Sequence, residues 1–219
     1  MIEYLEDLAQ TNMFSGINPE KIAGLLECVD GRVVHYSKDE MIIEEGSSVL
    51  TFGVMLSGHG RSLKWDASDR QVIITLLSQG SEIGVLLATN PEYASSVFVQ
   101  ALDDVSVLMI PFDRLLARCE KNCLQHEILL RNYLRIVAEK GLVLHERIDC
   151  LLKPTVRDKI MTYMLRVSKE QQSRTFSIPI NRNGMSKYLN VERSALSREL
   201  SQMKRDGILN YHRNEFELL

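Results

Sequence analysis

Residues 181–206 read NRNGMSKYLNVERSALSRELSQMKRD and predict two short helices joined by a tight turn. Asn181 is suited to cap the first helix, and Asn190 lies in the turn, where a residue that tolerates a left-handed backbone is needed. Apolar residues recur at helical spacing in both segments: Met185, Tyr188 and Leu189 in the first, and Ala195, Leu196, Leu200 and Met203 in the second. The stretch therefore predicts a helix-turn-helix.

The polar side of the second helix carries residue types that read DNA. They are Arg193, Ser194, Ser197, Arg198 and Lys204. An arginine can pair in a fork with guanine in the major groove, and a serine can reach a phosphate or a base edge. The plainer interpretation is an amphipathic surface helix whose charged side faces water.

The distribution of charge favours DNA. The whole chain has a net charge of −3, but residues 153–219 hold 13 Lys+Arg and 7 Asp+Glu, a balance of +6. Residues 1–152 hold 13 and 22, a balance of −9. A basic C-terminal third on an acidic remainder is typical of a nucleic-acid module attached to another domain.

Length and composition limit the remaining classes. A chain of 219 residues that is 45% hydrophobic can build two cores. It contains no apolar run long enough for a membrane span, and MIEYLEDLAQ at the N-terminus does not resemble a signal peptide. We therefore expect a cytoplasmic protein with no membrane partner. Four cysteines, Cys28, Cys119, Cys123 and Cys150, form no C-x-x-C pair, so no metal site is expected.

The first part of the chain predicts a β-domain flanked by helices. Residues 1–30 read as short helices, and 31–111 contain short apolar runs separated by Gly, Asp and Ser, as in a sandwich or barrel. The runs are VVHY (33–36), MII (41–43), FGVML (52–56), VIITLL (72–77), SVFVQA (96–101) and VSVLMI (105–110). Residues 112–122 look helical, and a long helical pattern follows over 124–152.

The long helix carries an a/d heptad seam, which is typical of two helices wound together. The seam consists of Leu130, Leu134, Val137, Gly141, Leu144, Ile148 and Leu151. The alternative is that this stripe packs on the chain's own barrel. Because a second apolar side carries Ile128, Leu129, Ile136 and Leu142, the helix can pack on its barrel and on a partner at once. We therefore expect a homodimer, whose paired recognition helices would read a near-palindromic operator.

This order of strands, long helix and basic helix-turn-helix resembles the Crp/Fnr family of bacterial transcription regulators. LNVERSALSRELSQMKRDGIL (189–209) is similar to the family's turn and recognition helix, and ILNYHRNEFEL (208–218) to its wing hairpin. KDEMIIEEGSSVLTFGVMLSG (38–58) and QVIITLLSQGSEIG (71–84) resemble strands of its cyclic-nucleotide-type jelly roll. The resemblance implies an α+β chain: an effector-sensing jelly roll with flanking helices (1–122), a dimerisation helix (123–152) and a winged helix-turn-helix (153–219).

The resemblance places DNA-reading arginines at Arg193 and Arg198, and a Ser-Arg pair of the Fnr branch at Ser197 and Arg198. Ser194 departs from the glutamate that most members use for cytosine, so the family's usual operator is not implied. Glu192 stands where Ser or Thr commonly caps this helix, although a carboxylate can also serve.

The effector site departs from the cyclic-AMP-binding members. In SEIGVLLATNPEYASSVFVQA (81–101), Val85 replaces the ribose-binding glutamate and Ser95-Ser96 replaces the Arg-Ser pair that holds the cyclic phosphate. We expect no cyclic AMP binding, no iron–sulfur cluster, because residues 1–27 lack cysteine, and no haem. What remains is a pocket lined by Val85, Ser95, Ser96 and Phe98. Either it takes an unidentified small-molecule effector, or it is empty and regulation lies elsewhere; no cofactor is predicted.

In the mechanism that the resemblance implies, the barrel senses, the long helix transmits, and a hinge near Lys153-Pro154 orients the DNA-binding domains. The loop 168–176 lies where family members contact RNA polymerase. One alternative is a cupin-type metal enzyme, although no H-x-H pair and no catalytic motif is present. The other is a ligand-binding module whose C-terminal domain contacts protein.

Overall fold

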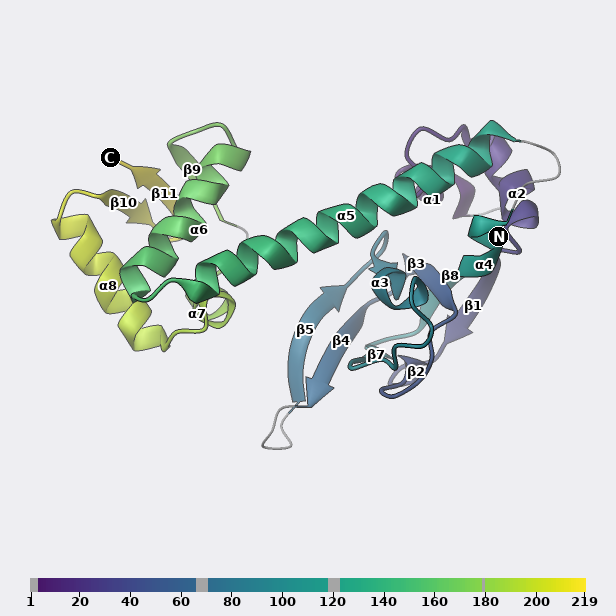
Figure 1. Cartoon of the computed structure of the whole chain (residues 1–219), viewed down its shortest axis with the longest axis horizontal. Coiled ribbons are helices and arrows are strands. Elements are labelled where there is room, and N and C mark those ends of the chain that lie inside the picture. Colours follow the sequence, from purple (N-terminus) through teal and green to yellow (C-terminus); the bar gives the residue numbers. More distant parts are fainter. Residues whose placement is uncertain (1–3, 66–70, 118–122, 179) are drawn as a thin grey trace. The chain divides into compact units, whose positions relative to one another are not determined.

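The computed structural model describes residues 4–65, 71–117, 123–178 and 180–219 (Figure 1). It divides into two compact units, Met1–Ala138 and Glu139–Leu219, with the division inside the long helix α5 (Leu124–Leu152). The expected α+β architecture is confirmed: a β-rich first unit, a long helix and a helix-rich second unit. The domain limits that the sequence places at residues 122 and 152 stay a prediction.

Within the described residues, the first unit contains eight strands and four short helices before α5. The helices are α1 (Leu5–Ala9), α2 (Pro19–Cys28), α3 (Val85–Ala88) and α4 (Phe112–Leu116). The strands are β1 (Arg32–Tyr36), β2 (Met41–Ile43), β3 (Thr51–Ser57), β4 (Gly60–Trp65), β5 (Gln71–Leu77), β6 (Glu82–Ile83), β7 (Phe98–Ala101) and β8 (Val105–Pro111). Residues 118–122, the second half of the helix expected over 112–122, lie outside the described residues.

The strands form two antiparallel sheets of four strands each, in the orders β1-β8-β3-β6 and β2-β7-β4-β5. Strands far apart in sequence are neighbours: Val34 on β1 faces Val107 on β8, and Arg61 on β4 faces Gln100 on β7. Such crossings are typical of jelly rolls and sandwiches. Strand β4 has no counterpart among the apolar runs, because its sequence GRSLKW is half polar.

The core between the sheets is completed by the first half of α5. Tyr133 on α5 is fully buried, with its ring 4.6 Å from that of Phe52 and 5.3 Å from that of Phe112. Its hydroxyl donates to the carbonyl of Val85 at 2.6 Å, and burial raises the pKa of this phenol. Leu129 and Ile136 are buried beside it, so this side of α5 packs on the β-domain as expected.

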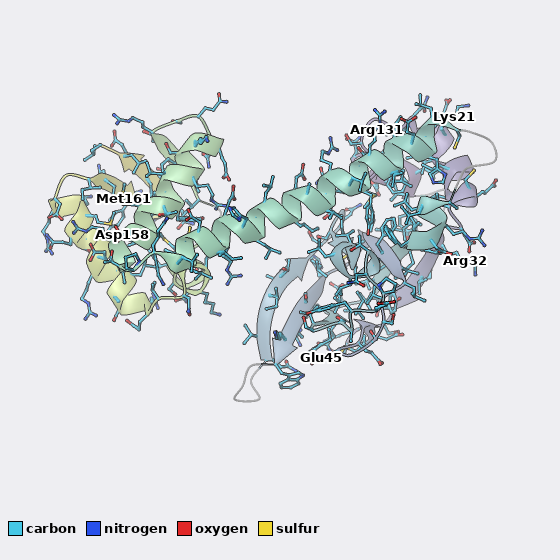
Figure 2. The ribbon with its side chains drawn as sticks, in the orientation of Figure 1. Lys21, Arg32, Glu45, Arg131, Asp158 and Met161 are labelled. Carbon is cyan, nitrogen blue, oxygen red and sulfur yellow. The ribbon has the colours of Figure 1, made fainter. Side chains whose placement is uncertain are left out.

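The second apolar side of α5 is not buried along its whole length. Leu142, which lies on that side, is 62% exposed. Arg131, labelled in Figure 2, lies on the outer side of the first half of α5 and pairs with Glu127 at 2.6 Å. The pattern of burial therefore changes along α5 although its helical repeat is continuous.

The second unit is a three-helix domain with a small sheet. Its elements after α5 are α6 (Val156–Glu170), β9 (Thr175–Ser177), α7 (Arg182–Leu189), α8 (Arg193–Arg205), β10 (Leu209–His212) and β11 (Glu215–Leu218). The strands pair in the order β10-β11-β9, and the β10–β11 hairpin is the expected wing. A separate core includes Met164, Met185 and Leu200, all fully buried.

Local capping explains where the helices begin. The side chain of Thr155 accepts from the backbone N of Asp158 at 3.1 Å and starts α6 directly after Pro154 (Asp158 is labelled in Figure 2). Asn181 accepts from Gly184 N at 3.0 Å and starts α7, and Asn190 ends it at φ +49°. The two side-chain hydrogen bonds satisfy backbone N–H groups that the start of a helix leaves free, and the left-handed conformation of Asn190 ends α7.

Candidate nucleic-acid interface and effector region

Helix α8 has the two-sided character expected of a recognition helix. Leu196, Leu200 and Met203 are fully buried. The five residues that the sequence assigns to DNA, Arg193, Ser194, Ser197, Arg198 and Lys204, are all exposed. Burial of one side holds the helix on its domain, and the exposed side, which carries the arginines, is accessible to a partner.

The N-terminus of α8 is capped by Glu192. Its carboxylate accepts from the backbone N of Ala195 at 2.9 Å and from the hydroxyl of Ser194. The Ser194 hydroxyl, together with the backbone N–H groups, lowers the pKa of Glu192. Glu192 therefore caps α8 in place of the usual Ser or Thr. It also engages the hydroxyl of Ser194, which is one of the predicted DNA contacts.

An arginine on α6 anchors the C-terminal half of α8. The Arg157 guanidinium pairs with Glu199 at 2.6 Å and with Asp206 at 2.7 Å, and both carboxylates belong to the recognition helix or its C-cap. These hydrogen bonds raise the pKa of Arg157, and Gln202 and Arg157 lower the pKa of Asp206. Two anchor points separated by seven residues restrict rotation of α8 about its own axis.

Tyr211 on the wing joins three elements, and sequence patterns gave no signal for it. The Arg182 guanidinium at the start of α7 lies 4.8 Å from the Tyr211 ring centre and 4.8 Å from that of Phe216. The Lys204 ammonium on α8 lies 5.4 Å from the same Tyr211 ring, and the Tyr211 hydroxyl is 3.4 Å from that of Ser201. Burial lowers the pKa of Arg182. The ring therefore positions Lys204 against the wing.

The end of α5 is packed on the DNA-binding domain. Arg166 on α6 pairs with Glu146 on α5 at 2.7 Å, and its guanidinium lies 5.7 Å from the Tyr188 ring on α7. Arg147 on α5 covers the same ring at 5.4 Å, and Cys150 is buried in the core of this unit. These contacts lie on both sides of Pro154, where the sequence places a hinge.

The predicted effector residues are largely buried in the first unit. Val85 begins α3, and its carbonyl receives the Tyr133 hydroxyl. Ser95 is buried, and its hydroxyl donates to the carbonyl of Val97 at 2.6 Å. Ser96 is half-buried. Phe98 is buried, with its ring 6.0 Å from that of Trp65. The Ser95 hydroxyl is thus used within its own turn.

The heptad seam divides into two parts. Leu130 and Val137 are partly buried against the core of the first unit. Leu134, Leu144 and Ile148 are 58%, 51% and 53% exposed, Gly141 is exposed, and Leu151 is half-buried. Large apolar side chains are rarely left exposed in a row along one helix of a monomeric protein.

No group of three or more His, Cys, Asp or Glu side chains lies close enough to hold a metal ion in the parts of the chain that the structure describes. Over the same parts, no helix has the length and apolar character to cross a membrane.

Two family models match this chain: the cyclic nucleotide-binding domain over residues 33–122 and the Crp-like helix-turn-helix domain over residues 158–219. The transcriptional activator protein FnrA of Stutzerimonas stutzeri is 27% identical over 188 residues, which are 83% of this chain and 74% of that protein.

Two solved structures share the fold. A variant of CooA from Carboxydothermus hydrogenoformans aligns with a TM-score of 0.62 at 17% identity, over 96% of this chain and 93% of that one. The catabolite activator protein of Thermus thermophilus aligns with a TM-score of 0.57 at 17% identity, over 95% and 94%.

Fold and site together define a DNA-binding transcription regulator with a cyclic-nucleotide-binding-like domain and a helix-turn-helix. The chain belongs to the Crp/Fnr family.

Proposed function

We propose that this chain is a cytoplasmic homodimer that binds near-palindromic double-stranded DNA through α8 and responds to a small-molecule effector other than cyclic AMP. The observation that supports DNA reading most directly is the exposed side of α8, where Arg193 and Arg198 lie five residues apart on a helix held at both ends. This side belongs to the C-terminal third, whose net positive charge attracts DNA phosphates and adds affinity for any sequence.

The proposed dimer rests on the exposed part of the α5 seam. Leu134, Leu144 and Ile148 follow the a/d repeat, and pairing with the same residues of a second copy would bury them. A two-fold dimer presents two copies of α8, and two copies read two half-sites of a palindrome. Dimerisation and operator symmetry are therefore one proposal.

The proposed effector differs from cyclic AMP because Val85, Ser95 and Ser96 stand at the positions where the resemblance places the groups that hold the ribose and the cyclic phosphate. Val85 offers no acceptor for a ribose hydroxyl, and the Ser95 hydroxyl is bonded to Val97. An effector shifts a regulator only by unequal affinity for its two states. The Tyr133–Val85 hydrogen bond gives such an effector a route from α3 to α5.

A contact with RNA polymerase is proposed at residues 168–176, which the structure divides among the end of α6, the loop 171–174 and the start of β9. Ser168, Lys169, Gln171 and Arg174 are exposed or half-buried there, whereas Phe176 is buried against Phe216. Phe176 therefore belongs to the fold of the domain, and the polar residues before it remain for a partner.

The decisive experiment selects bound duplexes from random DNA and then measures variants on the selected site. Arg193→Ala and Arg198→Ala should each weaken specific binding by about 1–3 kcal/mol per half-site and relax base preference, since each removes a base contact. Lys204→Ala should weaken all sequences alike. Fluorescence anisotropy at fixed salt measures both effects.

Arg174→Ala, an exposed arginine of the same domain that lies outside α8, is the matched control and should leave affinity unchanged. If Arg193→Ala and Arg198→Ala bind with the affinity and selectivity of the parent, α8 does not read the bases.

A further inference from the structure

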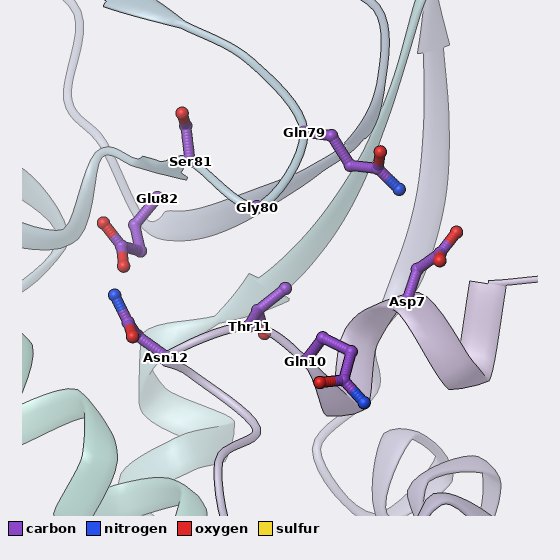
Figure 3. Close-up of a pocket in the computed structure, with 8 residues that line it drawn as sticks. All are labelled: Asp7, Gln10, Thr11, Asn12, Gln79, Gly80, Ser81 and Glu82. Atoms are coloured by element: carbon purple, nitrogen blue, oxygen red, sulfur yellow. The ribbon is translucent and has the colours of Figure 1, made fainter.

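The hollow between the end of α1 and the turn that joins β5 to β6 is an open polar surface (Figure 3). The residues that line it are exposed or half-buried, so water can satisfy their hydrogen bonds without a ligand. The tip of the β10–β11 hairpin is different, because its backbone adopts a conformation that its residue type disfavours.

The hairpin turn consists of two residues, Arg213 and Asn214, because His212 of β10 pairs with Glu215 of β11. Arg213 has a φ of +54°, in the left-handed region. Turns of this length that need a positive φ usually place Gly, Asn or Asp there, because a Cβ is strained in that region. Backbone strain of this kind occurs most often at functional sites, which makes Arg213 a candidate for a role that needs its side chain.

The hairpin holds its tip in one place. The Asn214 carbonyl accepts from the backbone N of Ile178 at 2.9 Å, which ties the turn to the chain after β9. Phe216, two residues further along, is buried with its ring 6.3 Å from that of Phe176 on β9. Arg213 itself is exposed. The backbone of the tip is therefore anchored, and the arginine side chain is left accessible.

The hairpin contacts both helices of the helix-turn-helix. Tyr211, two residues before Arg213, has its hydroxyl 3.4 Å from that of Ser201 on α8, and its ring centre lies 4.8 Å from the Arg182 guanidinium at the start of α7. In helix-turn-helix complexes the second helix enters the major groove and the first helix crosses the DNA backbone. A hairpin that borders both helices therefore lies at the edge of that groove, and the next groove along the duplex is the minor one.

Arg213 is the only Lys or Arg of the hairpin sequence 208–218. The same sequence carries Glu215 and Glu217, and both are exposed. A hairpin with two exposed carboxylates is poorly suited to lie along a row of phosphates, because like charges repel. A single arginine at the tip is suited to enter a narrow groove that the carboxylates on the strand do not follow.

We propose that Arg213 enters the minor groove next to the half-site that α8 reads, and that it favours operators whose flanking base pairs are A·T. A-tracts have a narrow minor groove, and its enhanced negative potential attracts arginine. A guanidinium is also more weakly hydrated than an ammonium, so an arginine loses less on leaving water. This inference rests on the proposed function, because Arg213 reaches the flank only while α8 occupies the adjacent major groove.

The test compares two duplexes that share the half-sites selected from random DNA and differ only in their flanks, one with A·T pairs and one with G·C pairs. Fluorescence anisotropy at fixed salt measures both affinities. The parent should bind the A·T-flanked duplex about three- to tenfold more tightly, and Arg213→Gly should bring this ratio close to one. Glycine removes the Cβ from a left-handed position, so Arg213→Gly should fold at least as well as the parent, which urea unfolding checks.

Arg174→Ala is the matched control. It removes an exposed arginine whose backbone carbonyl accepts from Leu218 N, at the opposite end of β11 from the tip, and it should leave the ratio unchanged. The proposal is overturned if the parent binds both duplexes alike or if Arg213→Gly leaves the ratio unchanged. It is also overturned if Arg213→Gly weakens both duplexes by the same factor, because that is the effect of losing a phosphate contact.

A failure of the proposed function has a different signature. No specific site is then selected from random DNA, or base preference survives in Arg193→Ala and Arg198→Ala, and the role of Arg213 fails with it. If those two variants lose base preference while the parent shows a flank ratio of one, α8 reads the bases and only the role of Arg213 is wrong.

Discussion

At the residue scale, the cap of α8 is the clearest departure from the usual pattern of such helices. Glu192 satisfies the free backbone N–H of Ala195 with a side chain longer than the usual Ser or Thr, and it takes the Ser194 hydroxyl as well. Ser194 is therefore less free to read a base than Ser197. We expect sequence preference to follow Arg193, Ser197 and Arg198 more than Ser194.

The same cap predicts a pH dependence of stability. The pKa of Glu192 is lowered below its ordinary 4.5, so its contribution to folding is complete above that value and is lost as the pH falls through the lowered pKa. Asp206, lowered from 3.8, acts in the same direction. Urea unfolding should show the domain losing stability as the pH falls below about 4.5 and through the two lowered pKa values.

Glu192→Ser keeps a strong cap without a titrating group and should reduce that acid sensitivity. An acid profile identical to that of the parent would show that other carboxylates dominate the loss.

Tyr211 yields a second prediction at this scale. Tyr211→Ala removes the ring that Lys204 and Arg182 both contact, and each contact is worth about 0.5–1 kcal/mol. The variant should weaken binding to all duplexes without changing base preference. Tyr211→Phe keeps both ring faces and should retain nearly full affinity. A shift of sequence preference in Tyr211→Ala, measured on matched duplexes, would instead assign the ring to base reading.

At the element scale, α5 has one half packed on the β-domain and its end packed on the DNA-binding domain. Leu129, Tyr133 and Ile136 are buried in the first unit, and Cys150 is buried in the second. The Arg166–Glu146 ion pair on either side of Pro154 opposes free rotation there. We infer that the end of α5 and α6 reorient together when the regulator switches.

The exposed stripe of α5 gives the element-scale prediction. Leu144→Asp should convert the proposed homodimer to monomer, because a buried unpaired charge in a helix pair costs several kcal/mol. Leu134→Asp should also favour the monomer, for the same reason. Analytical ultracentrifugation measures the change in mass.

Leu165→Asp provides the control, since Leu165 is 55% exposed on α6 and lies outside the seam. If both seam variants are still dimers, the stripe packs within one chain and does not form the dimer interface.

At the scale of the whole molecule, the question is which ligand the first unit accepts. The chain should not bind cyclic AMP measurably at micromolar concentration. A cyclic phosphate without an arginine partner loses about 3–5 kcal/mol, or two to four decades of affinity, and neutral hydroxyl hydrogen bonds return only about 0.5–1.5 kcal/mol each. Calorimetry with cyclic AMP and cyclic GMP is the measurement.

A dissociation constant near or below about 1 μM would mean that another cation holds the phosphate. Arg61 is the first residue to examine, although its guanidinium already donates to Gln100 at 2.8 Å. Arg61→Ala should then abolish the binding.

The sequence alone determined the features that depend on neighbours along the chain. The caps at Asn181 and Glu192, the turn at Asn190 and the apolar spacing of α8 act within a few residues, so pattern and propensity were enough to predict the helix-turn-helix. Strands with continuous apolar runs were predicted for the same reason. Strand β4 was missed because only Gly60 and Leu63 of its six residues are buried, so it contains no continuous apolar run.

Only the tertiary structure decided the features that join distant segments. Tyr133 meets Val85 across 48 residues, and Arg182 on α7 meets Tyr211 on the wing. The structure also leaves Leu142, on the second apolar side of α5, exposed. Periodicity identifies which side of a helix is apolar, but the surface that covers each turn depends on where the β-domain ends, and that is set by packing.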